Sequence, residues 1–210
     1  MTKNLRVKSS EYIDETNRIS FKFNGRTYHG FKGDTLASAL LANNVHLVGR
    51  SFKYHRPRGI MTSGSEEPNA IVQINPGTNS TEPNVRATEV EIYEGLEASS
   101  QNCWPSVKFD IGGINNFLSP FFPAGFYYKT FMWPASFWEK YEFFIRHSAG
   151  LGKSPTSSDP DIYDHRNIHC DVLVIGAGLS GILAAKNAAK NNFNTLLAVS
   201  YTHLTLPTKA

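Results

Sequence analysis

Residues 19–31 read ISFKFNGRTYHGF, and this stretch decides the fold of the first half of the chain. Aromatic or aliphatic side chains alternate with polar ones at residues 19–23, and Tyr28 and Phe31 stand among polar residues after Asn24-Gly25, a pattern typical of half-buried strands. An Asn-Gly pair between two such runs is the strongest short signal for a hairpin turn. We therefore expect two antiparallel strands, at residues 19–23 and 26–31.

A helix is expected directly after this hairpin. Asp34 is a favourable N-cap residue, because a short carboxylate accepts bonds from the first N–H groups of a helix. Leu36, Ala39 and Leu40 then recur at helical spacing and mark the face that packs on the core.

The order of elements beyond the helix predicts the fold class. A hairpin, a helix and then more strands is the order of a β-grasp, ferredoxin-like domain, which belongs to the α+β class. We place this domain at residues 17–97, after a polar N-terminal arm at residues 1–16. The further strands are expected at residues 45–48, 70–74 and 89–93.

Residues 98–150 are dense in Trp, Phe, Tyr and Pro and form a second region. They predict aromatic turns followed by a helix at residues 135–147. Aromatic side chains dominate buried interfaces, so another domain or subunit is expected to pack against this region. Residues 151–168, rich in Gly, Ser, Pro and Asp, are interpreted as a linker.

A second fold signal lies at residues 171–181, which read DVLVIGAGLSG. An apolar, β-branched strand, of the kind expected to be buried on both faces, runs into G-x-G-x-x-G, and a helix at 182–191 and a strand at 195–199 are expected to follow. This is the opening of a Rossmann-type α/β domain. Residues 169–198 hold only its βαβ start, so the predicted domain is truncated.

The glycine turn carries the predicted cofactor site. Gly176 permits the tight turn, Gly178 lets a pyrophosphate approach the backbone, and Gly181 lets helix and strand pack closely. The helix N-terminus then offers free N–H groups to the phosphates. The predicted cofactor-binding residues are Gly176, Ala177, Gly178, Leu179, Ser180 and Gly181.

The tail departs from the expected pattern. An acidic residue that binds a ribose hydroxyl is expected about 20 residues past the glycines, near Val199 or Ser200, and neither is acidic. Residues 199–210, VSYTHLTLPTKA, resemble a translated sequencing-library adapter. We interpret them as a non-native tail, and the chain as an N-terminal fragment of a longer protein.

A basic loop at residues 49–59, GRSFKYHRPRG, is the other candidate site. Its cations and aromatic rings suit a phosphate or a carboxylate on a cofactor, a substrate or a partner subunit. The alternatives are a solvated loop, or an anchor paired with Glu66 and Glu67. His55 lacks a neighbouring nucleophile or carboxylate in the sequence, so no catalytic role is assigned to it. The candidate contacts are Arg50, Lys53, Arg56 and Arg58.

Composition narrows the classes of function. A net charge of +3 without a wider basic surface argues against nucleic-acid binding. The two cysteines, Cys103 and Cys170, have no metal-binding spacing, so no metal site is expected. The N-terminus lacks the apolar core of a signal peptide, and no run is apolar enough to cross a bilayer. These features favour a cytoplasmic protein that does not bind membranes.

Several long motifs resemble one family. GDTLASALLANNVHLVGRSFKYHRPRGI, EEPNA, PNVRAT, SQNCWPS, PAGFYYKTFMWP and DVLVIGAGLSG closely resemble the alpha subunits of heterotetrameric sarcosine oxidases, from about Ile19 to Ala198. The resemblance implies a cytoplasmic oxidoreductase that acts on CH–NH donors with oxygen as acceptor. It would convert sarcosine to glycine, formaldehyde or methylene-tetrahydrofolate, and hydrogen peroxide.

The same resemblance implies the cofactors and partners. NAD would bind the glycine turn, FMN and FAD would belong to the whole complex, and tetrahydrofolate would bind a C-terminal region. The partners would be the beta, gamma and delta subunits. A 2Fe–2S cluster needs four ligands, and residues 58–70 contain no cysteine, so we expect a ferredoxin-like scaffold without an iron–sulfur cluster.

Two other functions remain open. A related amine or opine dehydrogenase, or a cyanide-forming oxidase, would share this order of domains. A non-catalytic assembly scaffold is the other alternative, because the expected chemistry lies outside this fragment. No catalytic residue is therefore assigned, and the fragment itself is expected to be inactive.

Overall fold

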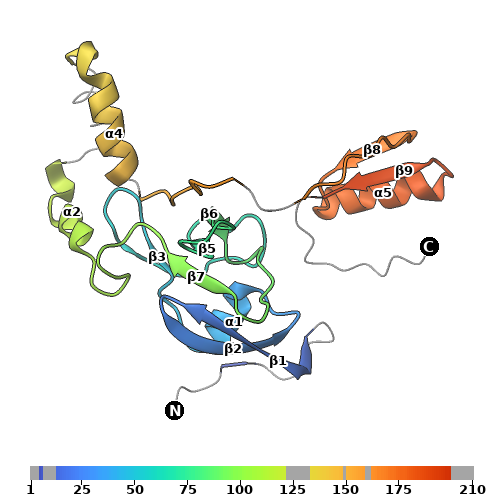
Figure 1. Cartoon of the computed structure of the whole chain (residues 1–210), viewed down its shortest axis with the longest axis horizontal. Coiled ribbons are helices and arrows are strands. Elements are labelled where there is room, and N and C mark those ends of the chain that lie inside the picture. Colours follow the sequence, from blue (N-terminus) through green and yellow to red (C-terminus); the bar gives the residue numbers. More distant parts are fainter. Residues whose placement is uncertain (1–4, 7–12, 122–132, 149, 159–161, 200–210) are drawn as a thin grey trace. The chain divides into compact units, whose positions relative to one another are not determined.

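The computed structural model describes residues 5–6, 13–121, 133–148, 150–158 and 162–199 (Figure 1). The chain divides into two compact units, Met1–Pro160 and Asp161–Ala210. Most of the predicted N-terminal arm and residues 200–210 of the predicted tail lie outside the described residues.

The predicted hairpin is confirmed. β1 (Asp14–Phe23) pairs antiparallel with β2 (Arg26–Lys32), and Phe23 lies opposite Arg26. Asn24 and Gly25 both have positive φ, 50° and 74°, as a type I′ turn requires. The alternation puts Phe21 and Phe23, at the end of β1, into the core, and Ile19 packs against it.

The helix is confirmed, but its predicted N-cap is wrong. α1 (Leu36–Ala42) is capped by Thr35, whose hydroxyl accepts from the N–H of Ser38 at 3.2 Å. Asp34 is instead fully buried, where its carboxylate accepts from the N–H of Phe31 at 2.9 Å and pairs with Arg6. The pairing of Asp34 with Arg6 could not be predicted from local sequence, because the two residues are 28 positions apart.

The main sheet has five strands in the order β2-β1-β7-β5-β6 (Figure 1). β1 and β7 run parallel and the other neighbours run antiparallel, so the sheet is mixed. This is the sheet that the ferredoxin-like prediction requires. Its three later strands are β5 (Ile71–Ile74), β6 (Glu82–Arg86) and β7 (Glu97–Ser100).

The later strands were predicted less well than the hairpin. The strand expected at 70–74 is confirmed by β5, whereas those at 45–48 and 89–93 are wrong. Residues 89–93 contribute only an isolated bridge between Glu91 and Thr35. Their apolar side chains pack on the core without joining the ladder, so an apolar pattern alone did not show strand pairing.

One hydrophobic core lies between this sheet and α1. It is made of fourteen buried side chains drawn from the hairpin, the helix, the later strands and the segments that connect them. Leu36 and Leu40 of α1 and Leu96 before β7 are fully excluded from solvent. The predicted inward face of the helix is therefore correct.

The aromatic region forms short helices. They are η1 (Ile111–Gly113), α2 (Ile114–Phe117), η2 (Ser119–Phe121), η3 (Ala135–Phe137) and α4 (Trp138–Ser148). The last two confirm the helix expected at 135–147. Large side chains such as Phe117, Phe121 and Trp133 are exposed, and the interface expected here stays a prediction.

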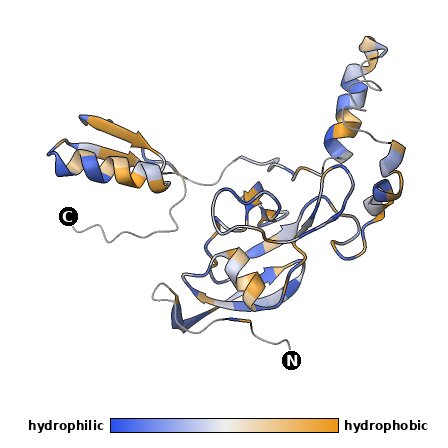
Figure 2. Cartoon of the chain, turned by 180° about the vertical axis from the view of Figure 1, so that it is seen from behind, coloured by the Kyte–Doolittle hydropathy of each residue, from blue (hydrophilic) through white to orange (hydrophobic). Residues whose placement is uncertain are grey.

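The second unit contains β8 (Val172–Ile175), α5 (Leu179–Lys190) and β9 (Thr195–Ala198). β8 and β9 pair in parallel, with Ile175 opposite Ala198. In Figure 2 the upper strand of this unit, β8, has the hydrophobic colour. The expectation of a strand buried on both faces is wrong for β8, because Ile175 is 82% exposed.

Among the helices of the described residues, none is long and apolar enough to cross a bilayer.

Candidate functional site

The first of two candidate sites is the basic loop at residues 49–59. β3 (Gly49–Arg50) pairs antiparallel with β4 (Pro57–Arg58) and closes the loop at its base. Inside it, the N–H of His55 donates to the carbonyl of Ser51 at 3.0 Å. His55 has a φ of 52°, and its side chain lies against Asp110 and Gly112.

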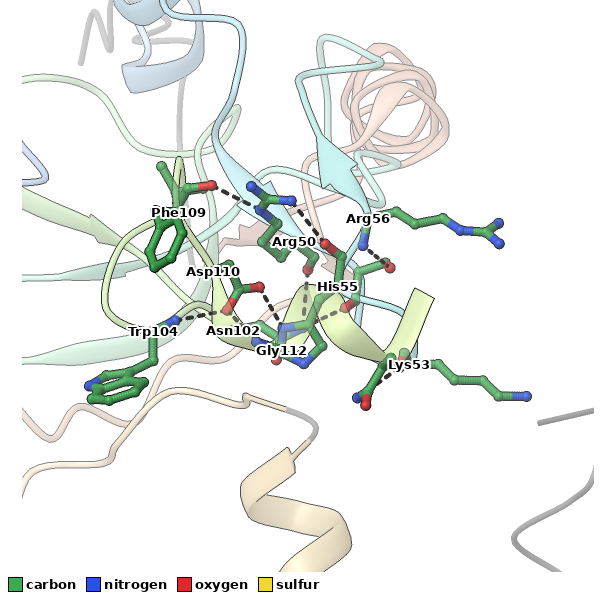
Figure 3. Close-up of polar contacts among 12 residues, drawn as sticks. Arg50, Lys53, His55, Arg56, Asn102, Trp104, Phe109, Asp110 and Gly112 are labelled. Carbon is green, nitrogen blue, oxygen red and sulfur yellow. Dashed lines mark hydrogen bonds and ion pairs between the residues drawn. The ribbon is translucent and has the colours of Figure 1, made fainter. Parts of the chain in front are cut away.

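Arg50 joins this loop to the segment that begins the aromatic region (Figure 3). Its Nε donates to the carbonyl of Val107 at 2.8 Å, and its two Nη atoms donate to those of His55 and Lys108 at 3.1 and 3.2 Å. A guanidinium satisfied by three carbonyl oxygens is a structural clamp. Arg50 therefore holds two segments together, and these contacts use much of its capacity to bind an anion.

His55 and Asp110 form the second link between the same segments (Figure 3). Nδ1 of His55 lies 2.7 Å from Oδ2 of Asp110, whose side chain is 1% exposed. The other oxygen of Asp110 accepts from the N–H groups of Trp104 and Gly112, each at 3.1 Å.

Sequence reasoning missed Asp110 entirely, because it lies 55 residues from His55. No local signal in the sequence connects the two residues. The pair orients the imidazole, yet no nucleophile contacts it among the described residues, so its evident role is to fix the loop.

The other cations of the loop point elsewhere. Figure 3 shows Lys53 and Arg56 extending away from Asp110. Both cations lie over the Tyr54 ring, at 5.0 and 4.7 Å from its centre, and Nε of Arg56 donates to Asn116 at 2.7 Å. Arg58 lines a pocket of about 160 Å³ beside Arg50. Anion or interface contacts by these residues stay a prediction.

The acids considered as partners of the basic loop do not pair with it in the recorded ion pairs. Glu67 is buried and accepts from the N–H groups of Met61, Thr62, Asn69 and Ala70. Burial raises the pKa of Glu67, but these bonds together lower it by more, so the pKa lies below its ordinary value. Glu67 therefore organises residues 61–70.

The second candidate site is the glycine turn between β8 and α5. Gly176 has a φ of +97°, which favours glycine, and a Cβ at Gly181 would overlap the carbonyl oxygen of Gly176. Gly178 is the N-cap of α5 and has open space where a Cβ would stand. Gly176 thus allows the turn, Gly178 leaves the backbone open to approach, and Gly181 allows close packing against Gly176. Nucleotide binding by residues 176–181 stays a prediction.

The comparisons with known proteins agree with the fold of the first unit. Residues 16–103 match the family model described as a 2Fe-2S iron-sulfur cluster binding domain. The mixed sheet and this match together define a ferredoxin-like domain.

Curated relatives extend the likeness along the chain. It is 58% identical to "Sarcosine oxidase subunit alpha" of Rhizobium meliloti (strain 1021) over 193 residues, which are 91% of this chain and 20% of that protein. It is 30% identical to the proteins of the same name from Corynebacterium sp. strains U-96 and P-1, over 88% of this chain and 14% of each of them. The predicted resemblance to sarcosine oxidase alpha subunits is confirmed. The chain spans about a fifth or less of the length of these relatives.

A solved structure, the L-proline dehydrogenase from P. horikoshii, also matches. It covers 86% of this chain and 24% of its own, with 16% identity and a TM-score of 0.40.

The expectation of a domain without an iron–sulfur cluster is contradicted by the family match, which describes a cluster-binding domain. The donor set of the chain does not, however, fit four thiolates, because Cys103 is the one cysteine within residues 16–103. Among the described residues, no group of three His, Cys, Asp or Glu side chains could hold a metal ion.

Proposed function

We propose that the chain is part of the alpha subunit of a sarcosine oxidase. The observation that carries this proposal is the 58% identity over 91% of the chain to a protein of that name. The proposed reaction consumes sarcosine, oxygen and water and yields glycine, formaldehyde and hydrogen peroxide. Because the chain spans a fifth of that relative, the activity would belong to the whole subunit and its complex.

Within that complex the chain would supply an assembly domain and one edge of a dinucleotide site. The parallel β8–β9 pair with α5 between the two strands supports NAD as the ligand of the glycine turn. The first N–H groups of α5 would donate to the pyrophosphate, and Gly178 would let it approach.

The remaining cofactors and partners follow from the proposed family. FMN and FAD would be held by the complex, and tetrahydrofolate by another region of the subunit. The beta, gamma and delta subunits would be its partners, and the exposed aromatic side chains of α2 and α4 offer a surface of the kind that subunits bury.

The test of this function uses the complete subunit, co-expressed with its neighbouring reading frames. We expect peroxide release when sarcosine is added, with one peroxide per glycine formed. Activity on an opine or on glycine in place of sarcosine would favour a related dehydrogenase or a cyanide-forming oxidase. Either result would overturn the proposed substrate.

A second candidate function, a non-catalytic scaffold, is favoured by one observation. Leu173 and Ile175 of β8 are exposed, so the small β8–β9 sheet leaves apolar side chains uncovered among the described residues. Calorimetric titration of the 210-residue chain with NAD tests it. Binding that saturates supports the dinucleotide site, and no binding supports the scaffold.

A further inference from the structure

An open cleft of about 480 Å³ lies in the first unit, beside the segment whose carbonyls Arg50 contacts. It is bounded by the β1–β2 turn, residues 45–47, the end of β7 and residues 103–108. Its lining includes no residue of the basic loop or of the glycine turn. Its volume falls within the range of small-molecule sites, about 300–1,000 Å³.

Much of the surface of this cleft is apolar. Phe23 and Val107 are buried, and Tyr28, Val45 and Leu47 are half-buried where they line it. These side chains come from four separate segments, so the apolar surface is a product of the tertiary fold. Such a surface binds the hydrocarbon part of a ligand by removing it from water.

The charges that line the cleft have one sign. Arg26 at the start of β2 and Lys108 on the facing segment are both cationic and exposed, and the lining contains no acidic residue. Neither cation takes part in an ion pair recorded among the described residues. A ligand with one negative charge would balance this positive potential.

The walls of the cleft are held in place before any ligand binds. Asn24 and Ser100 bond each other twice, at 2.8 Å each, and fix the hairpin turn to β7. On the other side, Arg50 holds the carbonyls of Val107 and Lys108. A preformed site avoids the ordering cost that a flexible one incurs on binding.

We propose that this cleft binds a small organic carboxylate with an aliphatic or aromatic body. The body lies on the apolar lining of Tyr28, Val45 and Leu47, and the carboxylate lies toward Arg26 and Lys108. Charge-assisted hydrogen bonds from these two cations are the interactions that select an acid over a neutral molecule. The site is independent of the proposed dinucleotide turn.

Cys103 provides a readout within the site, because its half-buried thiol lines the same cleft. Burial, and then the nearby Asp110, raise the pKa of this thiol, so alkylation is best followed at about pH 9. The variant Cys170→Ser removes the other thiol of the chain. Uncharged iodoacetamide then reports access to the cleft without a charge effect of its own.

The test compares 4-phenylbutyrate with its neutral amide on the full Cys170→Ser chain. We expect the acid to slow alkylation of Cys103 in a saturable way, with a dissociation constant below about 1 mM, and the amide to bind at least about tenfold more weakly. Equal protection by acid and amide would overturn the proposal. The absence of saturable protection by the acid would overturn it as well.

Substitutions of the two cations test whether their charges contribute to binding of the acid. Arg26→Gln and Lys108→Gln should each weaken binding of the acid by about tenfold, with little effect on the amide. Lys32→Gln is the matched control, since Lys32 lies at the far end of β2 and outside the lining. Equal losses in all three variants would show a general charge effect and refute the site. The acid–amide comparison on the parent chain does not depend on any variant folding.

Discussion

Nδ1 of His55 lies 2.7 Å from Oδ2 of Asp110, and this pair joins a loop beside the ferredoxin-like sheet to the start of the aromatic region. The two residues are 55 positions apart. Asp110 also accepts from two backbone N–H groups, so a single buried carboxylate organises both sides of the junction.

The strength of this link is measurable with a double-mutant cycle. His55→Ala and Asp110→Ala should each destabilise the chain, because each leaves a partner without its hydrogen bond. Their coupling free energy in urea unfolding should be about 1–3 kcal/mol. His29→Ala, on the exposed side of β2, is the control. Strictly additive losses would mean that the pair does not stabilise the junction.

Gly112 and Gly113 offer a sharper test of the same junction. A Cβ at Gly112 would overlap the ring of His55, whereas a Cβ at Gly113 has open space. Gly112→Ala should therefore cost about 1–3 kcal/mol by displacing the imidazole, and Gly113→Ala should change stability by less than about 0.5 kcal/mol. The measurement is equilibrium unfolding of both variants. Similar values for the two would contradict the observed packing.

Glu67 should make stability depend on pH. Its folded pKa is lowered, so its contribution is complete above its unfolded pKa of about 4.3 and is lost as pH falls through the lower folded value. Glu67→Gln should cost about 1–3 kcal/mol at pH 7, and the difference from the parent chain should shrink below about pH 4. Urea unfolding at several pH values measures this.

Glu66→Gln is the matched control, since Glu66 is the exposed neighbour of Glu67. It should leave the pH profile of the parent chain nearly unchanged. A Glu67→Gln variant whose stability deficit is the same at pH 3 and pH 7 would count against the inferred role of the carboxylate.

Because Thr35 caps α1 and Asp34 is buried, substitutions of these two residues should differ in their cost to stability. Thr35→Ala removes one N-cap hydrogen bond and should cost about 1 kcal/mol. Asp34→Ala removes the buried carboxylate that pairs with Arg6 and accepts from the N–H of Phe31, and should cost about 3–5 kcal/mol. Thermal unfolding of the two variants would decide between the assignments. A larger loss of stability for Thr35→Ala than for Asp34→Ala would contradict the inferred importance of the buried Asp34.

Two substitutions in the glycine turn distinguish a residue needed for packing from a residue proposed to bind NAD. Gly181→Ala places a methyl group against the carbonyl oxygen of Gly176, so it should disrupt the contact between α5 and β8. Gly178→Ala meets open space and should keep the fold while weakening NAD binding about tenfold or more. Amide hydrogen exchange in 172–198 reports the first effect and calorimetric titration the second. Normal NAD binding by Gly178→Ala would argue against the proposed site.

Local signals explain which parts of the fold could be predicted. The hairpin, α1 and the β8–α5–β9 unit each carry their own period and turn residues, so sequence reasoning found them. β6 and β7 were missed, because short strands with polar residues gain their pairing from neighbours already in the sheet. The prediction of Asp34 as the N-cap was wrong for a similar reason, because its actual partner, Arg6, is remote in sequence.

The sequence by itself determined the ferredoxin-like class, the glycine turn and the likeness to sarcosine oxidase alpha subunits, because these rest on local periodicity and contiguous motifs. Only the tertiary structure decided what the cations of the chain do. In the folded chain Arg50 donates to backbone carbonyls, and His55 pairs with Asp110. Arg26 and Lys108 line the same cleft. The physical reason is that such partners are chosen by the folding of distant segments onto one core, which no local pattern encodes.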